Sequence, residues 1–221
     1  VINKECYRYE RKFIVPLSLS HNIIYLISEN PGNFSEIYEE RQINNIYLDT
    51  LNYDFLKDNI NGNTTRKKIR LRWYGSLYGN VQPTLEIKIK SGLVGTKISF
   101  KLPSLNINQD INIQDFRSIL KSSELPKNIL SEVLLLDFTL LNSYSRKYFL
   151  SSCKKIRLTY DSNLYYYNIK NYNNINLYSI KDPSNIIELK YDQKEDNIVN
   201  KILISFPFRM SRNSKYVNGF H

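Results

Sequence analysis

The feature that most constrains the fold of this chain is a nine-residue stretch, Arg66 to Tyr74, in which cationic and apolar residues alternate. In an extended strand, successive side chains point to opposite faces of the sheet. One face of this strand would therefore carry three consecutive cations, which are Lys68, Arg70 and Arg72. Neighbouring cations repel one another unless an anion lies close to them. Such a strand is either a solvated edge that opposes aggregation or part of an anion-binding surface.

The same alternation recurs along the chain and predicts a fold built mainly from β-strands. Strand-like segments are joined mostly by turns, and several of them place Lys or Arg at alternate positions on one face. One long helical segment, over about residues 111–137, is broken at Pro126. We therefore predict an α+β, mainly β fold, in which residues 1–221 form a single domain with one antiparallel sheet or barrel and flanking helices.

The direction of the cationic faces decides what such a sheet can do. Faces that point outward make the protein soluble and nothing more. Faces that point into a closed barrel would line a basic cavity, and burying cations without partners is strongly unfavourable. A basic cavity is therefore expected only where water and a polyanion fill it.

The overall charge also indicates an anionic partner. The chain has 31 Lys and Arg against 21 Asp and Glu, which gives a formal net charge of +10. Nucleic acids, phosphorylated small molecules and anionic membranes are the usual partners of so basic a chain. The two cysteines and two histidines lack metal-ligand spacing, so we expect no Cys-His or Ser-His catalytic pair. There is no membrane-spanning apolar run and no signal-peptide pattern, so a cytoplasmic domain is expected. The start at Val1 suggests a piece of a longer chain.

Three carboxylates share the cationic faces. Each lies two residues before a lysine, in the pairs Glu10 and Lys12, Glu86 and Lys88, and Glu188 and Lys190. A carboxylate in such a place either neutralises a cation or holds a divalent metal that bridges phosphate oxygens. For Glu10 and Glu86 taken singly, a cross-strand ion pair is the simpler interpretation.

An ordered set of motifs resembles the VTC domain, the polyphosphate polymerase branch of the triphosphate tunnel metalloenzymes. The motifs run from about Tyr7 to Phe220, and they are Glu10-x-Lys12-Phe13, Lys68-x-Arg70-x-Arg72, Leu85-Glu86-x-Lys88, Lys97, Arg146-x-x-Phe149, Arg157-x-Thr159-x-Asp161, Glu188-x-Lys190 and Ser214-Lys215-Tyr216. The first motif reads Arg8-x-Glu10-x-Lys12, whereas the related CYTH branch has Glu-x-Glu-x-Lys. That difference favours the polymerase branch.

The resemblance implies an eight-stranded antiparallel β-barrel tunnel in which the γ-phosphate of ATP is transferred to polyphosphate with Mn²⁺ or Mg²⁺. By position, the residues implied to act on the transferred phosphate are Arg70, Arg72, Lys88, Arg146, Arg157 and Lys190. The residues implied to bind substrate are Lys12, Lys68, Lys97, Ser214 and Lys215. Glu188 would be the principal metal ligand, with Glu86 and Glu10 as further ligands.

Other functions stay open at this point. A non-catalytic domain that binds polyphosphate or an inositol phosphate, or a triphosphatase, would share the fold. A nucleic-acid-binding domain is disfavoured because Phe13, Trp73 and Tyr191 are predicted on the face opposite the cations, whereas base stacking needs both on one surface. The expected partners are ATP, polyphosphate or another triphosphate, and association with membrane proteins through other chains is left open.

Overall fold

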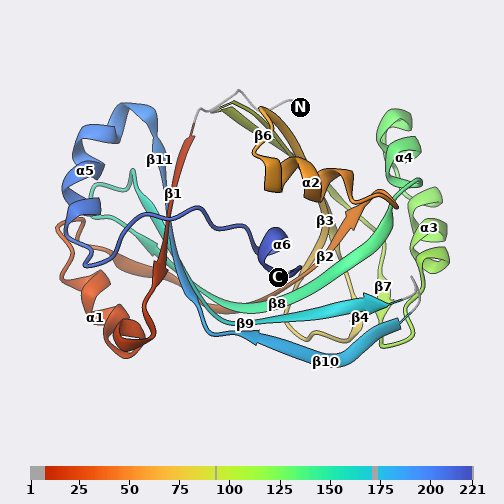
Figure 1. Cartoon of the computed structure of the whole chain (residues 1–221), viewed down its shortest axis with the longest axis horizontal. Coiled ribbons are helices and arrows are strands. Elements are labelled where there is room, and N and C mark those ends of the chain that lie inside the picture. Colours follow the sequence, from red (N-terminus) through yellow and green to blue (C-terminus); the bar gives the residue numbers. More distant parts are fainter. Residues whose placement is uncertain (1–7, 93, 171–173, 221) are drawn as a thin grey trace. The chain divides into compact units, whose positions relative to one another are not determined.

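The computed structural model describes residues 8–92, 94–170 and 174–220, and this part of the chain is mainly β (Figure 1). Its strands are β1 (Arg8–Val15), β2 (Ser35–Asp49), β3 (Thr65–Tyr74), β4 (Gly79–Val81), β5 (Thr84–Ser91), β6 (Val94–Lys101), β7 (Leu105–Ile107), β8 (Asp137–Leu150), β9 (Arg157–Lys170), β10 (Asn174–Asp182) and β11 (Asn185–Asp192). Its helices are η1 (Leu17–Asn22), α1 (Ile23–Ser28), α2 (Asp54–Asn61), α3 (Ile113–Lys121), α4 (Lys127–Val133), η2 (Gln193–Glu195), α5 (Asp196–Ile204) and α6 (Lys215–Asn218). None of the helices among the described residues has the length and apolar character needed to span a membrane.

The strands pair in the order β1-β11-β9-β8-β2-β3-β5-β6, with β10 on β9 and a separate pair formed by β4 and β7. The registers of β1 with β11, β11 with β9, β2 with β3, β3 with β5 and β5 with β6 are antiparallel. The path therefore has eight strands, as the resemblance implies. For the described residues this order is open, starting at β1 and ending at β6. The antiparallel sheet with flanking helices is confirmed, and a closed barrel is not.

Small differences separate the predicted elements from the observed ones. The alternating side chains from Tyr7 to Val15 predict a strand, and the strand β1 is seen from Arg8, since Tyr7 lies outside the described residues. A strand is also predicted from Lys155 to Asp161, and the observed strand β9 begins at Arg157. Cys6 and His221 also lie outside the described residues.

Two compact units make up the chain. The first comprises the described parts of Val1–Arg41, Tyr144–Leu164 and Asp182–Ser214. The second comprises the described parts of Gln42–Ser143, Tyr165–Lys181 and Lys215–His221. Each unit has its own hydrophobic core.

The core of the first unit lies between its strands and the helices α1 and α5, which Figure 1 shows to the left of β1 and β11. Phe13 and Val15 of β1 are each 1% exposed, as expected for the apolar face of an alternating strand. Further core residues are Ile23 and Ile27 of α1, Ile187, Leu189 and Tyr191 of β11, and Val199 and Ile202 of α5. The helices thus cover one face of these strands and leave the other face for polar residues.

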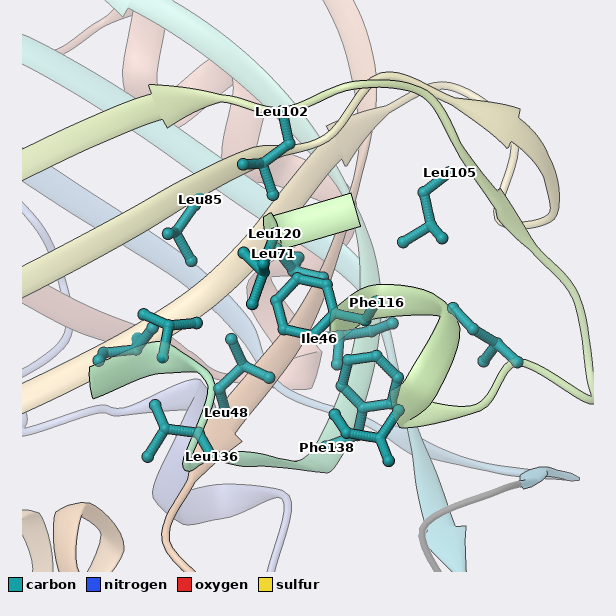
Figure 2. Close-up of a cluster of buried hydrophobic side chains, with 14 of the residues drawn as sticks. Ile46, Leu48, Leu71, Leu85, Leu102, Leu105, Phe116, Leu120, Leu136 and Phe138 are labelled. Carbon is teal, nitrogen blue, oxygen red and sulfur yellow. The ribbon is translucent and has the colours of Figure 1, made fainter. Parts of the chain in front are cut away.

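The core of the second unit is shown in Figure 2. Ile46 of β2, Leu71 of β3 and Leu85 of β5 belong to the same buried cluster as Phe116 and Leu120 of α3. Helix α3 begins after Asn112, whose side chain accepts hydrogen bonds from the backbone N–H groups of Gln114 and Asp115. Helices α3 and α4 lie on either side of Pro126, within the segment expected to be helical. Here too a row of cations on β3, namely Lys68, Arg70 and Arg72, is on the face opposite the core, whereas Lys67 is on the core side and pairs with Glu132 of α4.

Candidate phosphate-binding site

Strand pairing in the second unit arranges the cations of β3, β5 and β6 in rows. Residues that face each other in an antiparallel pair point to the same side of the sheet. Lys68 is the partner of Lys88, and Lys88 is the partner of Lys97, so three lysines form one row. In the next row, Arg70 is the partner of Glu86. The register therefore brings together six of the residues predicted to bind phosphate or metal: Lys68, Arg70, Arg72, Glu86, Lys88 and Lys97.

Glu86 is the centre of this group and is only 6% exposed. Arg70 donates two hydrogen bonds to Glu86 Oε2, from Nε at 2.9 Å and from Nη2 at 2.7 Å. Lys97 forms an ion pair with Oε1, and Nη1 of Arg72 lies 3.7 Å from Oε2. Three cations therefore surround one carboxylate. The cross-strand ion pair expected for Glu86 is present, although its partners are Arg70 and Lys97.

The charges around Glu86 change how it titrates. Burial alone would raise the pKa of Glu86, but Arg70, Arg72 and Lys97 outweigh burial and lower the pKa to about 2. The pKa of Lys97 is lowered, chiefly by burial, although Glu86 acts against this change. Glu86 is thus ionised throughout the physiological pH range, and the group of three cations and one carboxylate keeps a net positive charge.

Arg72 has a second partner that the sequence analysis did not single out. Its Nε donates a hydrogen bond of 2.9 Å to Oδ1 of Asn45, and both side chains are buried. Asn45 lies on β2 directly opposite Arg72. Its signal in the sequence is weak: it belongs to a pair of asparagines, Asn44 and Asn45, within an otherwise apolar strand segment.

The first unit has its own carboxylate surrounded by cations. In β1, β11 and β9, Lys12, Glu188 and Thr159 form one row, and Glu10, Lys190 and Arg157 form the next. Glu188 is 7% exposed, and its Oε1 lies 2.9 Å from Nζ of Lys190. Lys12 Nζ is 3.9 Å from Oε2 of Glu188, and Lys190 Nζ is also 3.8 Å from Oε1 of Glu10. The ammonium of Lys190 is therefore held between two carboxylates.

Electrostatics again fix the charge states. Burial would raise the pKa of Glu188, but Lys12, Lys190 and Arg146 lower it well below its ordinary value. Burial would lower the pKa of Lys190, but Glu188 and Glu10 raise it. Glu188 and Lys190 are thus both charged at neutral pH.

Arg146 is supported by a carboxylate rather than by an amide. Its Nε and Nη2 donate hydrogen bonds of 2.5 Å and 2.7 Å to the two oxygens of Asp161. Its guanidinium carbon lies 5.3 Å from the ring centre of Tyr144. Burial would lower the pKa of Arg146, but Asp161 raises it well above its ordinary value. Arg146 is therefore rigidly held, and Asp161 largely cancels its charge.

The remaining predicted residues are Arg157, Ser214 and Lys215. Arg157 is exposed and lies opposite Lys190. Lys12 Nζ donates a hydrogen bond of 3.1 Å to the backbone oxygen of Asn213, next to the half-buried Ser214 at the end of the first unit. Lys215 begins α6 in the second unit and is half-buried.

Tyr216 explains how α6 is held. Its hydroxyl donates a hydrogen bond of 2.5 Å to Asp49, and its ring stacks on that of Tyr47 with centroids 4.6 Å apart. Burial and the bond to Asp49 raise the pKa of Tyr216. Asp49 also accepts hydrogen bonds from the backbone N–H groups of Phe55 and Leu56 at the start of α2. Tyr216 thus fixes the helix that begins with Lys215.

A metal would find few protein ligands here. Within the described ranges, no group of three or more His, Cys, Asp or Glu residues is close enough together to hold a metal ion. Among the predicted ligands, Glu10 and Glu188 share the ammonium of Lys190. Two carboxylates suit Mg²⁺ or Mn²⁺ when phosphate oxygens and water complete the coordination.

Comparisons with known proteins place these observations in context. The family model of the VTC domain matches residues 7–221. The comparison with curated protein sequences gave no match at the required level of significance.

Solved structures show a similar fold. The PH1819 protein from Pyrococcus horikoshii OT3 aligns with a TM-score of 0.55 at 13% identity, covering 96% of this chain and 97% of that one. A candidate adenylate cyclase from Vibrio parahaemolyticus aligns with a TM-score of 0.55 at 9% identity, covering 96% and 97%. The candidate adenylyl cyclase HpAC1 from Hippeastrum, described as having a dominant triphosphatase activity, aligns with a TM-score of 0.55 at 16% identity, covering 96% and 94%. At these identities the similarity concerns the fold.

Proposed function

This chain belongs to the VTC domain family, and from that premise we propose that it is a metal-dependent phosphotransferase that moves the γ-phosphate of ATP onto a polyphosphate chain. The closed eight-stranded tunnel is part of this proposal. The antiparallel eight-strand order and the fold shared with the three solved structures support it.

The observation that carries the proposal is the row formed by Lys68, Lys88 and Lys97 beside the pair Arg70 and Arg72. Like charges placed directly opposite one another destabilise a sheet. Within this group, Glu86 is already shared by Arg70, Arg72 and Lys97. A polyanion that lies along the row would offset the remaining positive charge. A chain of phosphates has the repeating negative charge that such a row fits.

The residues present suit phosphoryl transfer, which needs positioning and neutralisation of charge more than covalent catalysis. Arginine presents a planar set of donors that can bind two phosphate oxygens, whereas lysine acts as a point charge. In this proposal Arg70 and Arg72 orient the phosphoryl group, and the lysine row holds the rest of the chain. The terminal oxygen of a phosphate chain is already ionised at neutral pH, so the acceptor needs no strong base.

Glu188 and Glu10 are the residues we propose to hold a divalent metal. Their fit is supported by the position of Lys190 Nζ, at 2.9 Å from one carboxylate and 3.8 Å from the other, where positive charge is already stabilised. Bound there, Mg²⁺ or Mn²⁺ would neutralise charge on the phosphate oxygens. Arg146 would contribute from a fixed position, since Asp161 holds it through two hydrogen bonds. The assignment of Glu86 to a metal stays a prediction.

Hydrolysis is the second candidate function, because the related fold of HpAC1 is described with a dominant triphosphatase activity. The two reactions differ only in whether a phosphate chain or water accepts the phosphoryl group. A domain that binds polyphosphate without turnover would use the same cationic rows.

The experiment that separates these functions is incubation of the purified chain with ATP and Mn²⁺ or Mg²⁺, followed by a gel that resolves phosphate chains. We expect long chains and ADP. Arg70→Ala should abolish product formation, whereas Lys67→Ala should not, because Lys67 is on the other face of β3 and pairs with Glu132 of α4. Free phosphate in place of chains would assign a triphosphatase, and tight tripolyphosphate binding without turnover would assign a non-catalytic domain. Equal losses in both variants would indicate a diffuse basic surface and refute the proposal.

A further inference from the structure

In the second unit, two buried asparagines and Arg72 are linked by a series of hydrogen bonds. Arg72 Nε donates to Oδ1 of Asn45 at 2.9 Å, and Nδ2 of Asn45 donates to Oδ1 of Asn142 at 2.8 Å. Asn45 lies on β2 and Asn142 on β8, and both are 0% exposed. Side-chain amides that are fully buried in the middle of strands are uncommon, so this series of hydrogen bonds needs a physical explanation.

The chemistry of Arg72 sets the direction of these hydrogen bonds. A guanidinium group has only donors, so Asn45 must turn its oxygen toward Arg72. The amide nitrogen of Asn45 then points to Asn142, whose amide oxygen must accept the hydrogen bond. Nδ2 of Asn142 is left buried without a hydrogen-bond partner among the described residues. Turning the Asn142 amide over would bring two NH₂ groups together.

An unpaired buried donor is unfavourable, so this arrangement is not the most stable one for Asn142 by itself. It follows from the requirement at the other end of this series of hydrogen bonds, where Arg72 needs an acceptor. The orientation of both amides is thus determined by the arginine.

We propose that Asn45 is a positioning residue for Arg72 that fixes the guanidinium through Nε without adding a negative charge of its own. This inference rests on the proposed function, in which Arg72 binds phosphate. The contrast with Arg146 is direct, because Asp161 holds that arginine through both carboxylate oxygens and cancels its charge. The neutral amide of Asn45 holds Arg72 through Nε alone, and Nη1 of Arg72 stays on the cationic face, 3.7 Å from Glu86.

Asn44 is a matched control in the same strand. It is also 0% exposed, but its side chain points to the other face and has different partners. Its Nδ2 donates to the backbone oxygens of Gly75 and Ser76, and its Oδ1 accepts from Ser143. A change at Asn44 therefore removes buried amide hydrogen bonds without touching Arg72.

The first test measures the affinity of the whole chain for tripolyphosphate, without metal, by calorimetry. Asn45→Ser should weaken binding about tenfold, the usual effect of losing one hydrogen bond to a charged group. Asn44→Ser should change the affinity for tripolyphosphate by less than about twofold. In a protein that already carries Arg72→Met, adding Asn45→Ser should lower the affinity by less than a further factor of about two. Equal losses at Asn44 and Asn45, or the full loss in the Arg72→Met background, would overturn the proposal.

The second test begins with an NMR measurement that needs no phosphate ligand, so this measurement separates the inference from the proposed function. In the NMR spectrum of the wild-type chain, the Nε–H of Arg72 should be protected from solvent exchange. The protection should be lost in Asn45→Ser and kept in Asn44→Ser and in Asn45→Asp, which is nearly isosteric and keeps the acceptor. Asn45→Asp should still weaken tripolyphosphate binding, because it cancels the charge of Arg72. A protected Nε–H in Asn45→Ser, or tight binding by Asn45→Asp, would show that Asn45 does not position Arg72.

Discussion

Replacing Glu86 by glutamine tests the electrostatic balance of the second unit most directly. Glu86 is 6% exposed and contacts Arg70, Arg72 and Lys97. Glutamine has nearly the same shape and can still accept hydrogen bonds, but it has no charge. The variant therefore leaves three cations close together without their internal counterion, and its effect on stability reports the charge alone.

The size of the effect follows from the pKa of Glu86. Its fall from the ordinary value of 4.5 to about 2 corresponds to about 3 kcal/mol of stability at neutral pH. The folded-state pKa is depressed, so this contribution is complete above pH 4.5 and is lost as the pH falls through 2. At pH 3.5 about 2 kcal/mol should remain. The difference in unfolding free energy between wild type and Glu86→Gln should therefore shrink as the pH is lowered.

Urea denaturation of both proteins at pH 7 and at pH 3.5 measures this difference. Glu132→Gln is the matched control, because Glu132 pairs with Lys67 on the other face of β3 and is about one-third exposed, so it should cost less than about 1 kcal/mol. A loss in Glu86→Gln of less than about 1 kcal/mol at pH 7, independent of pH, would refute the electrostatic reasoning.

A phosphate ligand adds a second readout. Tripolyphosphate without metal should stabilise Glu86→Gln more than wild type, because the phosphates take the place of the missing carboxylate. Glu132→Gln should respond as wild type does. If Glu86→Gln instead loses a Mg²⁺-dependent gain in tripolyphosphate affinity, then Glu86 is a metal ligand as predicted from the sequence, and its role as a counterion is refuted.

Three further changes test other parts of the molecule. Glu188→Gln should remove the metal dependence of turnover and leave the circular dichroism spectrum unchanged; turnover that keeps its metal dependence would contradict the assignment of Glu188. Tyr216→Phe should lower the unfolding free energy by about 1–3 kcal/mol in urea, because Asp49 loses a buried donor, and an unchanged midpoint would show that this hydrogen bond does not hold α6. Gly219→Ala should lower it by about 1–3 kcal/mol, since the added Cβ would lie 2.3 Å from Leu140, and a stabilised variant would contradict the tight packing.

The alternation in the sequence was sufficient to predict which residues share a face. Ile69, Leu71 and Trp73 are buried at 0–1% exposure, as the pattern of β3 requires. The helices α3 and α4 likewise follow from local signals, namely helical spacing and the break at Pro126. These properties depend on the geometry of neighbouring residues, so a single segment contains enough information.

The ion-pair and hydrogen-bond partners of the charged residues could not be predicted in this way. The sequence places Glu86 two residues before Lys88, but its observed partners are Arg70 on β3 and Lys97 on β6. The sequence also gives little or no indication of two further contacts. Asn45 accepts a hydrogen bond from Arg72, and Tyr216 holds α6 through its hydrogen bond to Asp49.

The strands, their apolar and cationic faces and the face to which most charged residues belong can be predicted from the amino-acid sequence, because the two-residue period of a strand is a local property. Which carboxylate pairs with which cation cannot be predicted in this way. That pairing depends on the register between segments far apart in the chain, such as Lys12 opposite Glu188. The register also sets how deeply each pair is buried and hence how far its pKa values move.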